Sequence, residues 1–142
     1  MNIRRKARET ALQVLYRMDI AEGVNSEAYE SELEGLAPGT EARRYSDALI
    51  KGILDKKAEI DSTIESHSDN WTIDRMGIVD RNILRVAVYE LKYSPDVPYK
   101  VIIDEAIELA KRFGSEDSGA FINGIIDKIR RSLEKPHAAR VK

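Results

Sequence analysis

The chain has 142 residues, the usual length of one domain, and this is enough to bury a core without metal or disulfide support. It has no cysteine, which excludes a disulfide framework, thiolate-bound zinc, an iron–sulfur cluster and a cysteine nucleophile. Its two histidines, His67 and His137, are far apart in the sequence, so neither a His-rich metal site nor a Ser-His-Asp triad is expected. The N-terminus lacks the apolar core of a signal peptide, and no stretch approaches the roughly 20 apolar residues of a membrane span. These features predict a cytoplasmic protein with no metal and no cofactor.

The formal net charge is −2, but the charges are unevenly distributed. Residues 1–18 are basic, residues 19–41 contain seven acidic residues and no basic one, and residues 128–142 are basic again. Basic clusters next to acidic ones are typical of an oriented site for a polyanion such as a nucleic acid. Charged chain ends that are merely solvated give the same pattern, so charge alone leaves both interpretations open.

Apolar residues recur at helical spacing along most of the chain. In the first half, the pattern predicts one helix that stops before Gly23 and a weaker, acidic helix over residues 26–36. Thr40 is the expected N-cap of a third helix that starts at Glu41. This helix continues, or restarts, at Asp55.

The second half shows a clearer pattern. Residues 74–93 are apolar around most of a helix circumference, which predicts a helix in the middle of a bundle. Pro98 suits the first turn of the next helix, and Gly114 is a natural stop for it. Ser115 is the expected cap of a last helix, with two acidic residues in its first turn. The sequence therefore predicts an all-α fold.

Several side chains combine a possible role in RNA binding with a simpler structural explanation. Cations are unfavourable at a helix N-terminus, so the basic start of the first helix favours either phosphate binding or a solvated arm. Tyr16 and Phe121 have rings that can stack on an unpaired base. The simpler interpretation is a half-buried position at the core edge for Tyr16 and a core position for Phe121. Asp117 and Ser118 are capping residues, or their oxygens accept hydrogen bonds from a base or a partner.

No constellation in the sequence points to catalysis. The carboxylates of Asp104, Glu105 and Glu108 share a predicted helix but have no histidine partner or metal motif. Gly114 and Gly119 do not form a phosphate-binding loop, because the GxxxxGK[ST] pattern is absent. We therefore expect no catalytic residues and no enzyme.

Three segments resemble the NusB family of bacterial transcription antitermination factors: RRKARETALQVLY, RNILRVAVYEL and VPYKVIIDEAIELAKRFGSEDSGAFINGIIDKI. The resemblance covers nearly the whole chain and is weak only in residues 22–40. It implies a single compact all-α domain over residues 1–134, with about six or seven helices arranged as two packed subdomains. These subdomains would span about residues 1–70 and 71–134, and a basic, flexible tail would follow at residues 135–142.

The resemblance also implies a function. Such a protein would bind single-stranded boxA RNA of ribosomal RNA leaders together with NusE, a small-subunit ribosomal protein, and so help RNA polymerase read through terminators. Matched position by position, it implies RNA contacts at Arg4, Arg5, Lys6, Arg8, Tyr16, Asp117 and Phe121. Asp80 matches an acidic position on the side that faces NusE.

Three alternatives remain. A NusB-like domain precedes the catalytic domain of some ribosomal RNA cytosine methyltransferases, but 142 residues leave no room for a domain that binds the methyl donor. A helical interaction module could instead form a homodimer that covers its own RNA-binding face. A hydrolase has the least support, because no plausible general base is present.

Overall fold

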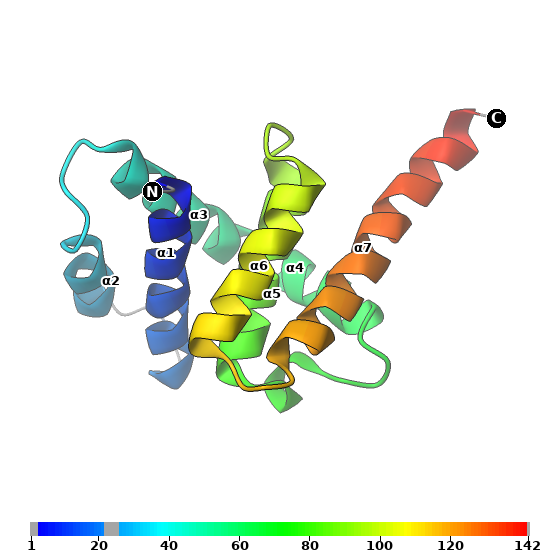
Figure 1. Ribbon diagram of the computed structural model, residues 1–142, viewed down its shortest axis with the longest axis horizontal. Coiled ribbons are helices and arrows are strands. Elements are labelled where there is room, and N and C mark those ends of the chain that lie inside the picture. The colour runs from blue at the N-terminus through cyan, green and yellow to red at the C-terminus, as the bar shows by residue number, and fades with distance from the viewer. Residues whose placement is uncertain (1–2, 22–25, 142) are drawn as a thin grey trace. The chain divides into compact units, whose positions relative to one another are not determined.

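The computed structural model describes the backbone of residues 3–21 and 26–141, and the side chains of these residues except 26, 28 and 135–141. Within these ranges helices are the only regular secondary structure, which confirms the predicted all-α class (Figure 1). The helices are α1 (Ile3–Ile20), α2 (Ser26–Leu33), α3 (Glu41–Asp55), α4 (Lys57–Ser66), the 3-10 helix η1 (Ile73–Arg75), α5 (Ile78–Tyr93), α6 (Tyr99–Phe113) and α7 (Ser118–Val141).

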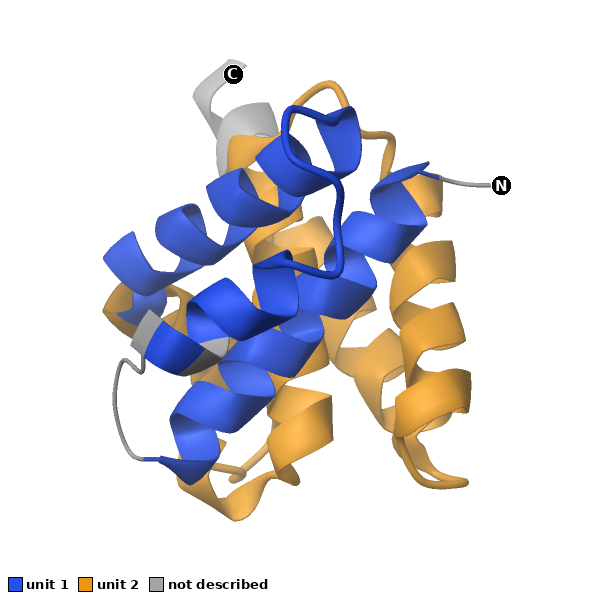
Figure 2. Cartoon of the chain, turned by 90° about the vertical axis from the view of Figure 1, so that its left-hand side faces the viewer, with its two compact units in different colours: residues 1–57 blue, residues 58–142 orange. Residues whose placement is uncertain are grey.

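The chain divides into two compact units, which we call unit 1 (residues 1–57) and unit 2 (residues 58–142) (Figure 2). The sequence analysis placed the boundary near residue 70, which would put α4 in the first unit. In the structure nearly all of α4 belongs to unit 2. Contacts with α5 tie α4 to unit 2. Arg85 of α5 donates hydrogen bonds of 2.8 and 3.0 Å to the carboxylate of Asp61 on α4.

Unit 1 consists of α1, α2 and α3, which all pack against one another. Apolar residues of α1 that recur at helical spacing are buried, and they include Ala7, Ala11, Val14, Leu15 and Met18. Thr40 caps α3 as predicted, because its hydroxyl oxygen accepts the backbone N–H of Arg43 at 3.3 Å. Gly39 precedes it with a φ of 76°, a conformation that glycine adopts without steric cost.

In unit 2, α5, α6 and α7 pack against one another. The predicted burial around α5 is confirmed by Ile83, Leu84, Val86, Ala87 and Val88, all of which are buried. However, α5 begins at Ile78 rather than at residue 74. Met76 has extended backbone angles and ends η1, so the predicted helix is split into two elements.

The prediction that Ser115 caps the last helix is wrong, since α7 begins at Ser118. The hydroxyl of Ser118 accepts the backbone N–H of Ser115 at 2.9 Å, which closes residues 115–117 into a turn before the helix. The backbone of α7 continues to Val141. It thus runs through most of the predicted flexible tail at residues 135–142, whose side chains lie outside the described part of the chain.

Candidate functional site

The basic start of α1 packs against an aromatic ring of α3. The guanidinium of Arg4 lies 4.4 Å from the ring centroid of Tyr45, and that of Arg8 lies 5.7 Å from the same centroid. The Nε of Arg4 is also 3.9 Å from a carboxylate oxygen of Glu41. A cation over an aromatic face is attracted by the ring electrons. These contacts offset the unfavourable position of cations at a helix N-terminus.

The four predicted phosphate-binding residues differ in exposure. Arg5 and Lys6 are exposed, Arg4 is half-buried, and Arg8 is only 2% exposed. Arg5 and Lys6 are therefore the two that present their charges to a ligand most directly. Arg8 stays a predicted RNA contact, but its side chain would have to become accessible before it could reach a phosphate.

Tyr16 lies further along the same helix. It is 37% exposed, which agrees with the half-buried position at the edge of the core that was the simpler interpretation of its spacing. The 1.5 Å rise per residue of an α-helix places it about 16 Å from Arg5 along the axis of α1. An extended strand of RNA could span this distance, so a role for Tyr16 as a stacking residue stays a prediction.

Three predicted site residues of unit 2 lie around the start of α7. Phe121 is half-buried, and its N–H donates a 3.2 Å hydrogen bond to the carbonyl of Asp117, the exposed residue just before the helix. Asp80, at the start of α5, accepts a 2.6 Å hydrogen bond from the hydroxyl of Ser118. One oxygen of Asp80 is thus engaged in holding the turn, and its contact with NusE stays a prediction.

The sequence did not single out Trp71 and Arg75, which accompany Phe121. The rings of Trp71 and Phe121 meet edge to face, with centroids 6.3 Å apart and an angle of 77° between the planes. The guanidinium of Arg75 lies 5.5 Å from the Trp71 ring centroid. The one available signal was that Trp71 is the only tryptophan and stands where the helical pattern lapses.

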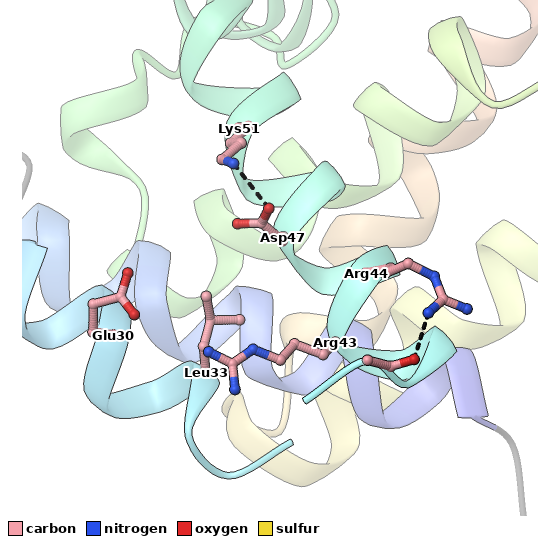
Figure 3. Close-up of a pocket in the computed structure, with 7 residues that line it drawn as sticks. Glu30, Leu33, Arg43, Arg44, Asp47 and Lys51 are labelled. Carbon is pink, nitrogen blue, oxygen red and sulfur yellow. Dashed lines mark hydrogen bonds and ion pairs between the residues drawn. The ribbon is translucent and has the colours of Figure 1, made fainter. Parts of the chain in front are cut away.

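A polar cavity of about 360 Å³ lies in unit 1 beside α2 and α3 (Figure 3). It is lined by Glu30, Leu33, Gly39, Arg43, Arg44, Asp47 and Lys51. Lys51 lies 3.0 Å from a carboxylate oxygen of Asp47, and Arg44 donates to the Gly39 carbonyl. Asp47 also accepts a hydrogen bond from the hydroxyl of Tyr29. In this cavity Asp47 and Lys51 thus compensate each other's charge, whereas Arg44 donates to a backbone carbonyl.

This arrangement changes the acidity of two groups. Burial, together with the hydrogen bond to Asp47, raises the pKa of the Tyr29 hydroxyl above its usual value. Burial also acts to raise the pKa of the Asp47 carboxyl, but hydrogen bonds from Tyr29 and Lys51 outweigh it and lower that pKa. At neutral pH, the pair is therefore a neutral phenol that donates to a carboxylate.

We expect Asp47→Asn to lower the free energy of unfolding at pH 7, because the amide is a weaker acceptor than a carboxylate. The native pKa of Asp47 lies below its ordinary value of 3.8, so its stabilising effect is complete above that pH. The effect is lost as the pH falls through the lowered native pKa. Urea unfolding at pH 7 and at pH 3 should show the difference between wild type and variant shrinking in acid.

Tyr29→Phe provides the matched control, because it removes the hydrogen-bond donor and leaves Asp47 in place. In a Tyr29→Phe background, Asp47→Asn should have a smaller effect at pH 7. A difference between wild type and Asp47→Asn that stays constant from pH 7 to pH 3 would contradict the role given to this pair.

The fold is all-α, and its exposed side chains include cations on α1 and aromatic rings near α7. These features are those of a helical protein that binds a ligand on its surface. Among the described residues, no group of three His, Cys, Asp or Glu side chains could hold a metal ion. None of the helices in the described ranges is long and apolar enough to cross a membrane.

The chain belongs to the NusB family. Residues 5–131 match the family model. The transcription antitermination protein NusB of Myxococcus xanthus is 44% identical over 140 residues, covering 96% of this chain and 100% of that protein. NusB of Geobacter sulfurreducens is 49% identical over 134 residues, covering 94% and 97%. The family consists of non-enzymatic transcription antitermination factors, which confirms the prediction that this protein is not an enzyme.

Solved structures show the same fold. T. maritima NusB superposes with a TM-score of 0.84 and 36% identity over 90% of both chains. A chain in a crystal structure of antitermination factors NusB and NusE in complex with double-stranded RNA gives a TM-score of 0.83 and 32% identity, covering 93% of this chain and 98% of that chain. The similarity thus extends over nearly the whole molecule in both comparisons.

Proposed function

We propose that this protein is a cytoplasmic antitermination factor that binds single-stranded boxA RNA of ribosomal RNA operons. In this proposal it acts with NusE, and the resulting heterodimer joins the antitermination complex of RNA polymerase. The observation that carries the proposal is the similarity, over nearly the whole chain, to a chain of a solved complex of NusB and NusE with double-stranded RNA. The exposed cations on α1 and the aromatic side chains near α7 supply suitable chemistry for RNA.

The proposed contacts fall into two groups with different roles. Arg4, Arg5, Lys6 and Arg8 of unit 1 would bind phosphates, which gives affinity that does not depend on sequence. Tyr16, Asp117 and Phe121 would contact bases, by stacking or by hydrogen bonds to base amino groups. Asp80 would face the basic partner NusE, where an acidic group is electrostatically favourable.

The proposal can be tested by titrating a labelled boxA RNA and a scrambled RNA of equal length, at low and at near-physiological salt, with and without NusE. We expect a preference for boxA that increases when NusE is present. Equal, salt-sensitive binding to both RNAs that NusE does not change would reduce the basic residues to a non-specific patch and contradict the proposal.

Replacing Arg5 and Lys6 by alanine should weaken binding to boxA and scrambled RNA alike. Each lost phosphate contact should reduce the slope of log affinity against log salt by about 0.7, the value for single-stranded nucleic acid. The double variant should therefore reduce the slope by about 1.4. Fluorescence anisotropy at four or more salt concentrations measures this slope.

The matched control is Lys100→Ala with Lys111→Ala, because it removes the same charge from two exposed residues of α6. This control should leave the salt slope within error of wild type. A loss of slope equal to that of the Arg5 and Lys6 variant would show that net charge, rather than these positions, sets the affinity.

Light scattering of the free protein tests the homodimer alternative. A dimer that dissociates when boxA RNA is added would mean that the RNA-binding face is covered in the free protein. A monomer that binds RNA directly would exclude this form of regulation.

A further inference from the structure

An exposed indole stands beside the predicted RNA contact Phe121. Trp71 is 45% exposed although it is the largest apolar side chain in the sequence, and Phe121 packs against its ring edge to face. Arg75 places a cation 5.5 Å from the same ring. Tryptophan usually buries most of its surface, so an open ring flanked by a cation suits a ligand that is flat and carries negative charge nearby.

The turn that carries Trp71 is held in place by several contacts. The hydroxyl of Ser68 donates a 2.9 Å hydrogen bond to the backbone carbonyl of Trp71. The backbone N–H of Trp71 donates to the Ser68 carbonyl at 3.2 Å. Asp69 and Asn70 both have positive φ, a conformation that Asp and Asn tolerate better than most residues. Lys128 of α7 binds the Asp69 carboxylate at 2.6 Å. An ordered turn loses little conformational entropy when a ligand binds.

We propose that the indole of Trp71 is a stacking surface for an unpaired base of the bound RNA. This inference rests on the proposed function, since it adds a base contact next to Phe121. Aromatic rings stack on all four bases, because every base has a flat π face. The contact between Arg75 and the ring is weaker than a base stack at an exposed site. A base therefore takes the ring face, and Arg75 binds the neighbouring phosphate.

The proposal distinguishes single strands from duplexes. In double-stranded RNA both faces of each base are covered by its neighbours, so no base is available to stack on a protein ring. Duplex RNA still carries phosphates and still binds to the cations of the protein. A comparison of single-stranded with duplex RNA in one experiment therefore separates stacking on Trp71 from electrostatic binding.

The experiment uses the intrinsic fluorescence of the full-length protein. The chain has one tryptophan, so its emission reports on Trp71 alone. The protein is titrated with dye-labelled single-stranded boxA RNA and with the same RNA paired to its complement. Tryptophan emission and dye anisotropy are followed in the same samples. We expect the single strand to quench the emission in proportion to binding, and the duplex to bind without quenching.

Variants test the same contact by affinity. Trp71→Ala should weaken binding to the single strand by about tenfold and leave duplex binding unchanged. Trp71→Phe should retain most of the affinity, because phenylalanine also stacks. Tyr93→Ala is the matched control, since Tyr93 is an exposed aromatic residue of α5 in the same unit, and it should not change binding. Circular dichroism without RNA checks that each variant is folded.

The outcomes separate this inference from the function on which it rests. RNA binding with unchanged tryptophan emission would overturn the stacking role and leave the proposed function intact. Absence of binding to either RNA by the wild-type protein would overturn both. Quenching by NusE alone, with no response to RNA, would make Trp71 a protein contact and would also overturn the inference.

Discussion

Asp61→Ala is expected to lower the free energy of unfolding by about 3 kcal/mol, because it removes a carboxylate that binds a buried guanidinium. Arg85 is only 3% exposed and donates two hydrogen bonds to Asp61, at 2.8 and 3.0 Å. A loss of this size is a large part of the 5–15 kcal/mol that is typical of a folded domain. Urea unfolding monitored by circular dichroism measures it.

Asp127→Ala is the matched control for this substitution. Asp127 pairs with Arg131 at 2.9 Å, but on the surface of α7. An exposed ion pair contributes less than about 1 kcal/mol. If Asp61→Ala costs no more than Asp127→Ala, the buried pair does not hold α4 to α5 as we infer.

Gly114→Ala is expected to lower the free energy of unfolding by about 2 kcal/mol, because the added methyl group has no room. A Cβ at this position would lie 2.6 Å from the Ser118 hydroxyl oxygen and 2.8 Å from the Ala110 carbonyl oxygen. To relieve these contacts, the end of α6 or the start of α7 must shift. Such a shift would disturb the hydrogen bond from Ser118 to Asp80. Thermal and urea unfolding both measure the loss.

Gly124→Ala serves as the control on the same stretch of chain. A Cβ at Gly124 meets nothing within 4 Å, and the residue lies inside α7. Alanine is a better helix former than glycine by about 0.5–1 kcal/mol, so this change should raise stability. Equal effects of the two substitutions on the free energy of unfolding would show that close packing at Gly114 does not contribute to stability.

The helices were predictable because their signals are local. Apolar periodicity within one segment predicts which face of α1 or α5 is buried, and Thr40 caps α3 through a residue three positions away. The start of α7 was missed for a different reason. Ser115 is a good capping residue by type, but it lies in a turn that Ser118 closes, and Ser118 is itself hydrogen-bonded to Asp80, which is distant in the sequence.

The candidate site was only partly predictable, since side-chain neighbours far apart in the sequence leave no local pattern. Arg85 and Asp61 are separated by 24 positions, so the sequence alone suggests two surface charges. Their pairing depends on the packing of α4 against α5. Trp71 likewise shows its contact with Phe121 only in the folded unit. Burial also changed the interpretation of Arg8, whose charge predicted an exposed side chain.

The turn before α7 separates the residues that support it from those that face outward. Gly114, Ser115 and Ser118 determine its shape, because Ser115 is hydrogen-bonded to the Ser118 hydroxyl. Glu116 and Asp117 are exposed. The outward positions can therefore change during evolution at little cost to the fold. Asp117, a proposed base contact, is one of these positions. Under that proposal, the RNA preference of the protein can change here one residue at a time without loss of the fold.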